Sequence, residues 1–182
     1  MTSLSILLGM AENNAWANLR FYRACAKLSD SDLRAKRTSF FPSIHATLVH
    51  NAWVDEYYFD ALVGGGRGRS IFENEERFHD FGALRAAQAA VDSKLVAFVA
   101  GLKDEAALDV KVDLARRNNH TQVETVGLVL LHLFEHQIHH RGQAHAMLAG
   151  TDVEPPQLDE FFLAEELPLR ESELRDLGLR VR

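Results

Sequence analysis

The segment from residue 129 to residue 147 constrains the fold more than any other part of this chain. One stripe of it advances in alternating steps of four and three residues: Val129, Leu133, His136, His140, Gln143 and Met147. Such stepping places side chains on one face of an α-helix, the face that packs against the core. The stripe predicts a long, partly buried helix that directs two histidines inward.

Histidines are concentrated in the same segment, with five of the nine lying between residues 132 and 145. Imidazole is the commonest protein ligand for divalent metals, and two histidines at i and i+4 lie one turn apart on one helix face. His136 and His140 have this spacing. The alternative is a pair of hydrogen-bonded core histidines, since each buried ring nitrogen needs a partner. An inward pair favours a metal site.

A third ligand is expected elsewhere, because catalytic zinc sites have three protein ligands and one exchangeable position. His50 is the candidate. It lies on a second helical stripe, which advances in steps of three and four residues and is formed by Ala46, His50, Trp53, Tyr57 and Ala61. Alone, His50 would be interpreted as a packed core histidine. Because it points inward, as His136 and His140 do, it becomes the predicted third ligand.

A competing motif overlaps the pair. His132, Glu135 and His136 match H-x-x-E-H, in which two histidines bind zinc and the glutamate is the general base of a hydrolase. That arrangement needs a further ligand downstream on its own helix, and only a proline-interrupted tail follows. The motif is therefore the weaker interpretation.

Three segments resemble the DinB/YfiT-like metalloprotein family: NAWAN at residues 14–18, FFPSIHATLVH at 40–50 and HLFEHQIHHRGQ at 132–143. The similarity covers roughly residues 4–162, and HHRGQ is its most specific part. It implies an all-α, up-and-down four-helix bundle holding one divalent metal, zinc or nickel, through histidines that match His50, His136 and His140. Glu135 stands where related chains often have Asn, so it either alters the surroundings of the ligands or faces solvent.

The pattern of the chain predicts one domain over residues 1–182, with residues 151–182 as a C-terminal extension packed on the helices or against a second subunit. We expect long helices near residues 4–27, 42–64, 81–101 and 122–150. Alternation at 108–114 and Asn118-Asn119 predict a small hairpin or extended crossover before the last helix. Gly142, which disfavours a helix interior, predicts a close helix crossing.

Composition excludes several classes. The net charge of −6 argues against a nucleic-acid surface, which draws on basic side chains. No apolar run is long enough to span a membrane. A single cysteine, Cys25, excludes an internal disulfide and is expected to pack in the core. These features predict a cytoplasmic location.

Three neutral imidazoles would leave the charge of a divalent metal uncompensated, which favours capture of a thiolate or activation of water. The family resemblance implies a thiol-dependent S-transferase that acts on a small-molecule substrate with a low-molecular-weight thiol. A homodimer is a separate expectation, which follows from the possible packing of the C-terminal extension against a second subunit. A metal-dependent hydrolase and a non-catalytic metal-binding or stress protein are the alternatives. No general base is assigned. Asp55, Glu56 and Asp92 are candidates for carboxylates behind the ligands, although each is more readily interpreted as a surface charge.

Overall fold

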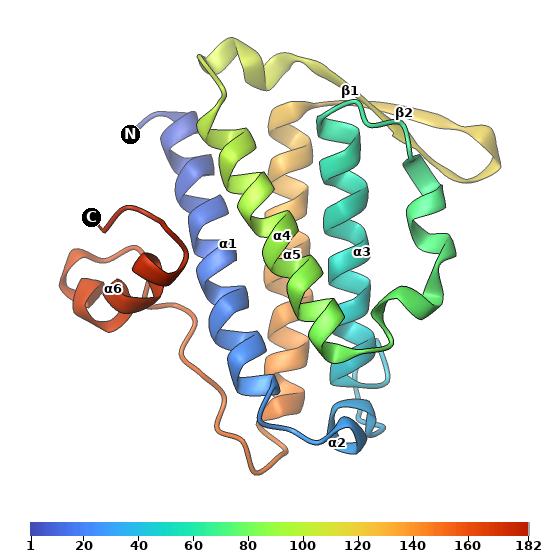
Figure 1. The fold of residues 1–182 in the computed structure, drawn as a ribbon. Coiled ribbons are helices and arrows are strands. Elements are labelled where there is room, and N and C mark those ends of the chain that lie inside the picture. Colours follow the sequence, from blue (N-terminus) through green and yellow to red (C-terminus); the bar gives the residue numbers. More distant parts are fainter. Residues whose placement is uncertain (182) are drawn as a thin grey trace.

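The computed structural model describes residues 1–181, apart from the side chain of Glu75, and is mostly helical (Figure 1). Four long helices lie side by side: α1 (Ser3–Cys25), α3 (Ile44–Leu62), α4 (Phe81–Ala100) and α5 (Val126–Leu148). Helix α3 packs on α5 and on α4, and α1 packs on α4 and on α5. The all-α prediction is thereby confirmed in its coarse form. No helix within residues 1–181 is long and apolar enough to cross a membrane.

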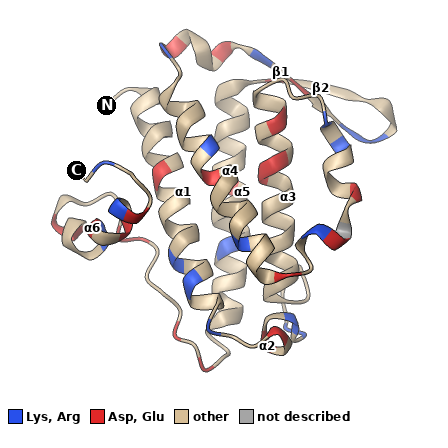
Figure 2. Cartoon of the chain, viewed as in Figure 1, with Lys and Arg blue, Asp and Glu red and all other residues tan. Residues whose placement is uncertain are grey.

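Short elements connect the long helices. Helix α2 (Asp30–Arg34) follows α1, and helix α6 (Leu167–Asp176) lies near the C-terminus. The remaining connections contain 3-10 turns: η1 (Gly68–Glu73), η2 (Glu75–Phe78), η3 (Glu105–Asp109), η4 (Arg117–Asn119) and η5 (Ala164–Glu166). In Figure 2, basic and acidic residues are interspersed along the helices and connections.

The connection between α3 and α4 changes the expected topology. Residues 63–80 carry the chain back along the length of α3 through η1 and η2, so α3 and α4 run in the same direction (Figure 1). The side-chain packing supports this parallel direction, because Phe59 near the C-terminal end of α3 packs on Phe98 near the C-terminal end of α4. The expected up-and-down order is therefore wrong. The glycine-rich stretch 64–68 opens a long crossover, where an alternating order would need a short turn.

The predicted hairpin is confirmed. Strands β1 (Lys111–Ala115) and β2 (Thr121–Thr125) pair antiparallel, with Ala115 opposite Thr121. Asn118 and Asn119, with φ of 58° and 55°, form the turn between them. The last helix was expected to begin near Gln122, which is wrong, because that residue pairs in the β-ladder and α5 begins only at Val126. Thr125 caps the helix by accepting a hydrogen bond from the Leu128 amide.

Within the described residues, the core contains three apolar clusters: a small one of Trp16, Ala17, Phe161 and Leu174, and two larger ones that are separated by buried polar residues. One of the larger clusters contains Leu7, Val99 and Leu133, and the other contains Phe21, Leu48 and Leu84. Between them along the helices lies a polar layer, to which each long helix contributes two residues: Asn14, Asn18, Asn51, Asp55, Gln88, Asp92, Gln137 and Arg141. Cys25 belongs to the cluster that contains Phe21, as expected, and burial raises the pKa of its thiol to about 12.

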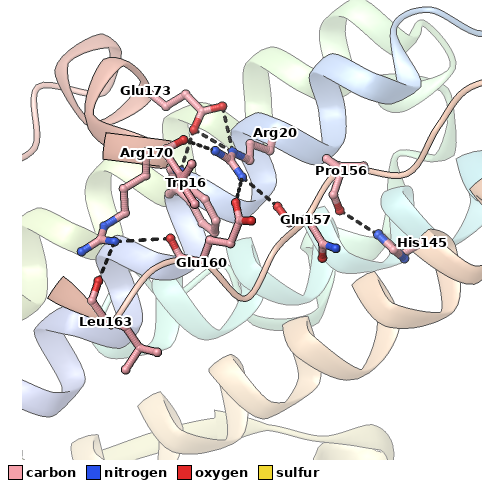
Figure 3. A network of polar contacts seen from close by, with 10 residues as sticks. Trp16, Arg20, His145, Pro156, Gln157, Glu160, Leu163, Arg170 and Glu173 are labelled. Atoms are coloured by element: carbon pink, nitrogen blue, oxygen red, sulfur yellow. Dashed lines mark hydrogen bonds and ion pairs between the residues drawn. The ribbon is translucent and has the colours of Figure 1, made fainter. Parts of the chain in front are cut away.

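The C-terminal segment packs on α1 (Figure 3). Trp16 of α1 contacts Phe161 and donates a 2.8 Å hydrogen bond to Glu173, and Arg20 pairs with Glu173 at 2.7 Å and with Glu160 at 3.0 Å. The tail thus lies against the chain's own helices, which was one of the two alternatives. Residue 182 lies outside the described residues.

Candidate metal centre

Three histidines from two helices meet at one point. His50 projects from α3, and His136 and His140 project from α5 one turn apart. Their candidate ligand atoms all lie within 4.8 Å of one another, and Nε2 of His50 is 3.0 Å from Nε2 of His136. Among residues 1–181, this is the group of three or more His, Cys, Asp or Glu side chains that could hold a metal ion. The structure therefore brings together the three histidines selected from the sequence.

The spacing fits a single ion. Two nitrogens bound at about 2.0–2.1 Å to one tetrahedral metal lie about 3.4 Å apart, so the 3.0 Å pair is already close to that separation. The His140 ring centroid is 4.5 Å from that of His136 and 4.8 Å from that of His50. The three rings are thus close enough together for their nitrogens to converge on one ion.

The three rings are held in the uncharged form that binds metals. Burial, reinforced by the neighbouring His140, lowers the pKa of His50 to about 4. Burial and the surrounding histidines lower the pKa of His136 to about 3. Burial also lowers the pKa of His140, against the effect of its hydrogen bond to Gln143. Each ring therefore offers a lone pair at neutral pH.

Gln143 orients one of the ligands. Nδ1 of His140 lies 2.8 Å from Oε1 of Gln143, while the Gln143 Nε2 lies 3.1 Å from Nε2 of His139. The amide donates to His139, so its oxygen accepts the Nδ1 hydrogen of His140. That assignment leaves Nε2 of His140 free for a metal, in the arrangement usual for metal-binding histidines.

His136 has a buried nitrogen that requires an acceptor. Its Nδ1 has no hydrogen-bond partner among the described residues. Two buried acceptors on α3, Oδ1 of Asn51 and Oδ1 of Asp55, also lack a described partner. A histidine that binds metal through Nε2 normally donates its other N–H to an oxygen, so this nitrogen is where such a partner would be expected.

The polar layer joins α3 to α5 beside the ligands. Nδ2 of Asn51 donates to Oε1 of Gln137 at 3.1 Å, and Nε2 of Gln137 donates to Oδ2 of Asp55. Asn51 follows His50 in the sequence, and Gln137 follows His136. The hydrogen bonds therefore fix the relative position of the two backbones that carry the ligands.

The layer continues to the other two helices. Nε2 of Gln88 on α4 donates to Asp55 at 2.7 Å and to Asp92 at 3.1 Å. Arg141, which follows His140, donates to the side-chain oxygens of Asn14 and Asn18 on α1 at 2.7 and 2.9 Å. All four long helices are thus linked at the depth of the histidines.

Two buried carboxyl groups share this layer with one guanidinium. Burial raises the pKa of Asp55 to about 7, and burial together with the Asp55 charge raises the pKa of Asp92 to about 8. Burial lowers the pKa of Arg141 to about 10, which leaves it charged at neutral pH. The interpretation of Asp55 and Asp92 as surface charges is wrong, since both are buried. Glu56 is partly buried as well, with a side chain that is 12% exposed, and it pairs with Arg77 at 2.5 Å.

A sequence signal for the polar layer existed and was missed. Its members form four pairs at i and i+4, one pair on each long helix: 14 and 18, 51 and 55, 88 and 92, 137 and 141. Such a pair lies on one helix face, and the same pairing on every long helix indicates a shared buried level.

The overlapping protease-like motif does not form a site in the described residues. His132 is exposed, its ring lies 6.2 Å from that of His136, and it packs against Tyr58. Glu135 is also exposed, so it faces solvent and does not alter the surroundings of the ligands. His145 approaches the carbonyl oxygen of Pro156 instead of the triad.

The expected close crossing at Gly142 is wrong. This residue is exposed, and a methyl group placed there would meet no atom of another element within 4 Å. Gly142 lies on the solvent side of α5, away from the stripe that faces α3.

Two phenylalanines border the triad, and their role was not predicted from the sequence. The Phe41 ring centroid lies 4.3 Å from that of His50 and 5.4 Å from that of His140. Phe40 packs on Phe41 at 4.9 Å with the rings nearly perpendicular. Both come from the loop that precedes α3.

A helical protein whose long helices bring three neutral histidines to one point belongs to the class of proteins that can hold a divalent metal ion in a helical core. The chain belongs to the DinB family, whose family model matches residues 2–171. The resemblance seen in the sequence is thereby confirmed. A search of the curated proteins found no match.

Proposed function

We propose that His50, His136 and His140 bind one divalent metal ion, zinc or nickel, and that the protein is a thiol-dependent S-transferase acting on a small molecule. The observation that carries this proposal is the convergence of three histidine side chains, whose candidate ligand atoms all lie within 4.8 Å of one another and which bind metals as uncharged imidazoles. A divalent ion held by such ligands keeps its full charge and would stabilise the anion of a low-molecular-weight thiol.

The chain's own residues support that role in three ways. The two helices hold the imidazoles at the spacing of a single ion, and Gln143 fixes the ring orientation of His140. The polar layer keeps α3 and α5 in register behind the ligands. Phe41 covers two of the rings, which reduces access of water from that side.

The fold proposed to carry this site is a four-helix bundle with one long crossover, formed by α1, α3, α4 and α5. Support for it comes from the pairwise packing of the four helices and from the polar layer that joins them.

Titration of the cobalt-substituted protein with glutathione and other small thiols tests the proposal. A thiolate bound to cobalt should give a sulfur-to-metal charge-transfer band, and His136→Ala should abolish it. His132→Ala is the matched control, because His132 lies on the same helix outside the triad and should leave the band intact.

Three outcomes separate the candidate functions. A thiol-dependent band supports the transferase. If small carboxylates or esters perturb the metal spectrum and no thiol does, the metal-dependent hydrolase replaces it. If no added ligand perturbs the spectrum, the site has no exchangeable position and the non-catalytic metal-binding protein replaces both.

A further inference from the structure

Phe41 contacts ligands from both helices at once. Its ring is tilted by 35° over His50 of α3, at a centroid distance of 4.3 Å, and by 56° relative to His140 of α5, at 5.4 Å. Favourable aromatic pairs have centroid distances of about 4.5–7 Å and offset or tilted geometries; the His140 contact lies within this range and the His50 contact is slightly closer, so the ring is packed on the triad. One side of the histidine cluster is therefore an aromatic surface.

Phe40 extends this surface into solvent. Its ring meets Phe41 edge-on at 4.9 Å and 82°, lies 6.1 Å from His140, and is 78% exposed. A single exposed aromatic side chain is ordinary. Here, however, the ring stands beside three candidate metal ligands, where an apolar group bound next to the metal would cover it and displace water from its surface.

The loop that carries both rings is closed by its own hydrogen bonds. The Arg37 amide donates to the Pro42 carbonyl at 2.8 Å, which encloses residues 38–41. Arg37 also donates from its side chain to the Asp32 carbonyl at 3.2 Å, and Ser43 caps α3 immediately after the loop. The two rings are thereby placed at the triad by a constrained loop.

The charged groups of the polar layer lie behind the ligands, whereas the side chains that directly contact the three rings are uncharged or aromatic. In the described residues, the ring and hydrogen-bond contacts of the triad are made by Phe40, Phe41, His132, His139 and Gln143, without a carboxylate, lysine or arginine. A ligand that reached the metal along this side would gain contact with aromatic carbon and would find no countercharge for an ionic substituent.

We infer that Phe40 and Phe41 form the apolar wall of a ligand subsite beside the metal, and that this wall selects molecules whose metal-binding group carries an aryl substituent. The inference rests on the metal binding in the proposed function and adds the class of substituent. Phe41 is the inner, fixed face of the subsite, and Phe40 is its outer edge.

A pair of hydroxamates, which chelate metals through two oxygens, tests the inference without requiring a thiol. Acetohydroxamate carries a methyl group where benzohydroxamate carries a phenyl ring. Affinities for the cobalt-substituted protein are read from the metal absorption spectrum. The phenyl group should be buried against the two phenylalanine rings. The protein should therefore bind benzohydroxamate about tenfold or more tightly than acetohydroxamate, after correction for the difference in affinity of the two compounds for free cobalt in solution.

The variants Phe40→Ala and Phe41→Ala should each reduce the preference for benzohydroxamate. In Phe41→Ala the preference should fall below about threefold, and in both variants the affinity for acetohydroxamate should change little. Phe162→Ala is the matched control, because Phe162 has a comparable exposure of 58% and packs on Phe161 at the C-terminal segment. It should leave the preference unchanged. Since Phe40 is largely exposed, its variant should fold even if the Phe41 variant does not.

Equal affinity for the two hydroxamates, or a preference that survives in the Phe40→Ala protein and in a folded Phe41→Ala protein, would overturn the inference. If neither hydroxamate perturbs the spectrum, the metal has no open position beside the rings and the inference also falls. A retained aryl preference without any thiol-dependent band would refute only the transferase.

Discussion

Asn51 on α3 donates a hydrogen bond of 3.1 Å to the side-chain oxygen of Gln137 on α5, and each of these residues directly follows a histidine of the triad. Both side chains are buried. A buried amide pair satisfies two polar groups that would otherwise lack partners, so it is formed only at one relative position of the two helices. The register that it selects is the one that brings His50 to His136.

Replacing Asn51 with leucine should therefore weaken both folding and metal binding. The variant leaves the Gln137 oxygen buried without its donor, which should lower the free energy of unfolding by about 1–3 kcal/mol. Metal affinity should fall by about tenfold to a hundredfold, the usual effect of residues that orient metal ligands. Urea denaturation of the metal-free protein and competition with a chelating dye measure the two effects.

Ser93→Ala is the control for this experiment, since Ser93 is an exposed helical residue whose hydroxyl donates to the Ala89 carbonyl of its own helix. It should change neither quantity appreciably. A leucine variant with reduced stability and unchanged metal affinity would show that the amide pair serves packing alone and does not position the ligands.

The sequence predicted the helical fold, the hairpin and the meeting of the three histidines because each depends on a periodic pattern. His50, His136 and His140 stand on helical stripes, and residues 111–115 alternate in burial along β1. The direction of α4 was not predictable in this way. It depends on residues 63–80, whose two short 3-10 turns have no strong periodicity.

The polar layer and the aromatic wall were missed for different reasons. Asp55 and Asp92 are acidic, and isolated acidic residues are usually exposed, so only partners on other helices explain their burial. Phe40 and Phe41 lie in a loop, where no stripe indicates the direction of a side chain. The homodimer, the small-molecule substrate and the cytoplasmic location stay predictions.

The ligand assignment can be tested by comparing two single variants. His140→Ala should lose bound metal because it removes one of three ligands, whereas His132→Ala should retain it, because that ring is exposed and packs on Tyr58. Metal content after gel filtration, measured by atomic emission, distinguishes them. The opposite result would restore the overlapping H-x-x-E-H interpretation.

Removing the metal should lower the melting temperature. Ligands from α3 and α5 come together only in the folded chain, so a metal present at a hundred times its dissociation constant adds about 2.7 kcal/mol to stability. For a chain of this length that corresponds to about 5–10 °C. Calorimetry before and after chelation, with far-ultraviolet circular dichroism of the metal-free protein, gives the comparison. The helices should persist because their apolar clusters remain, and an unchanged melting temperature after verified metal removal would contradict the coupling.

Above about pH 7, where the three histidines are uncharged in both the folded and the unfolded state, the buried carboxyl groups should make the metal-free protein less stable as the pH rises. The pKa of Asp55 is raised from 3.8 to about 7 and that of Asp92 from 3.8 to about 8, both chiefly by burial. Between about pH 4 and pH 8 the folded state therefore holds protons that the unfolded state has released. Their contribution to stability is greatest below pH 4 and declines as the pH rises through the two folded pKa values.

Asp92→Asn removes the group with the higher pKa and keeps a side chain that can still bond within the layer. The free energy of unfolding, measured by urea denaturation at several values between pH 7 and pH 9, should decline less steeply in this variant than in the unaltered chain. Asp109→Asn is the control for the loss of one formal charge, because Asp109 is exposed. Its free energy of unfolding should vary with pH as that of the unaltered protein does. Parallel pH profiles for all three proteins would mean that Asp92 is ionised throughout this range, with Arg141 compensating its charge in the folded state.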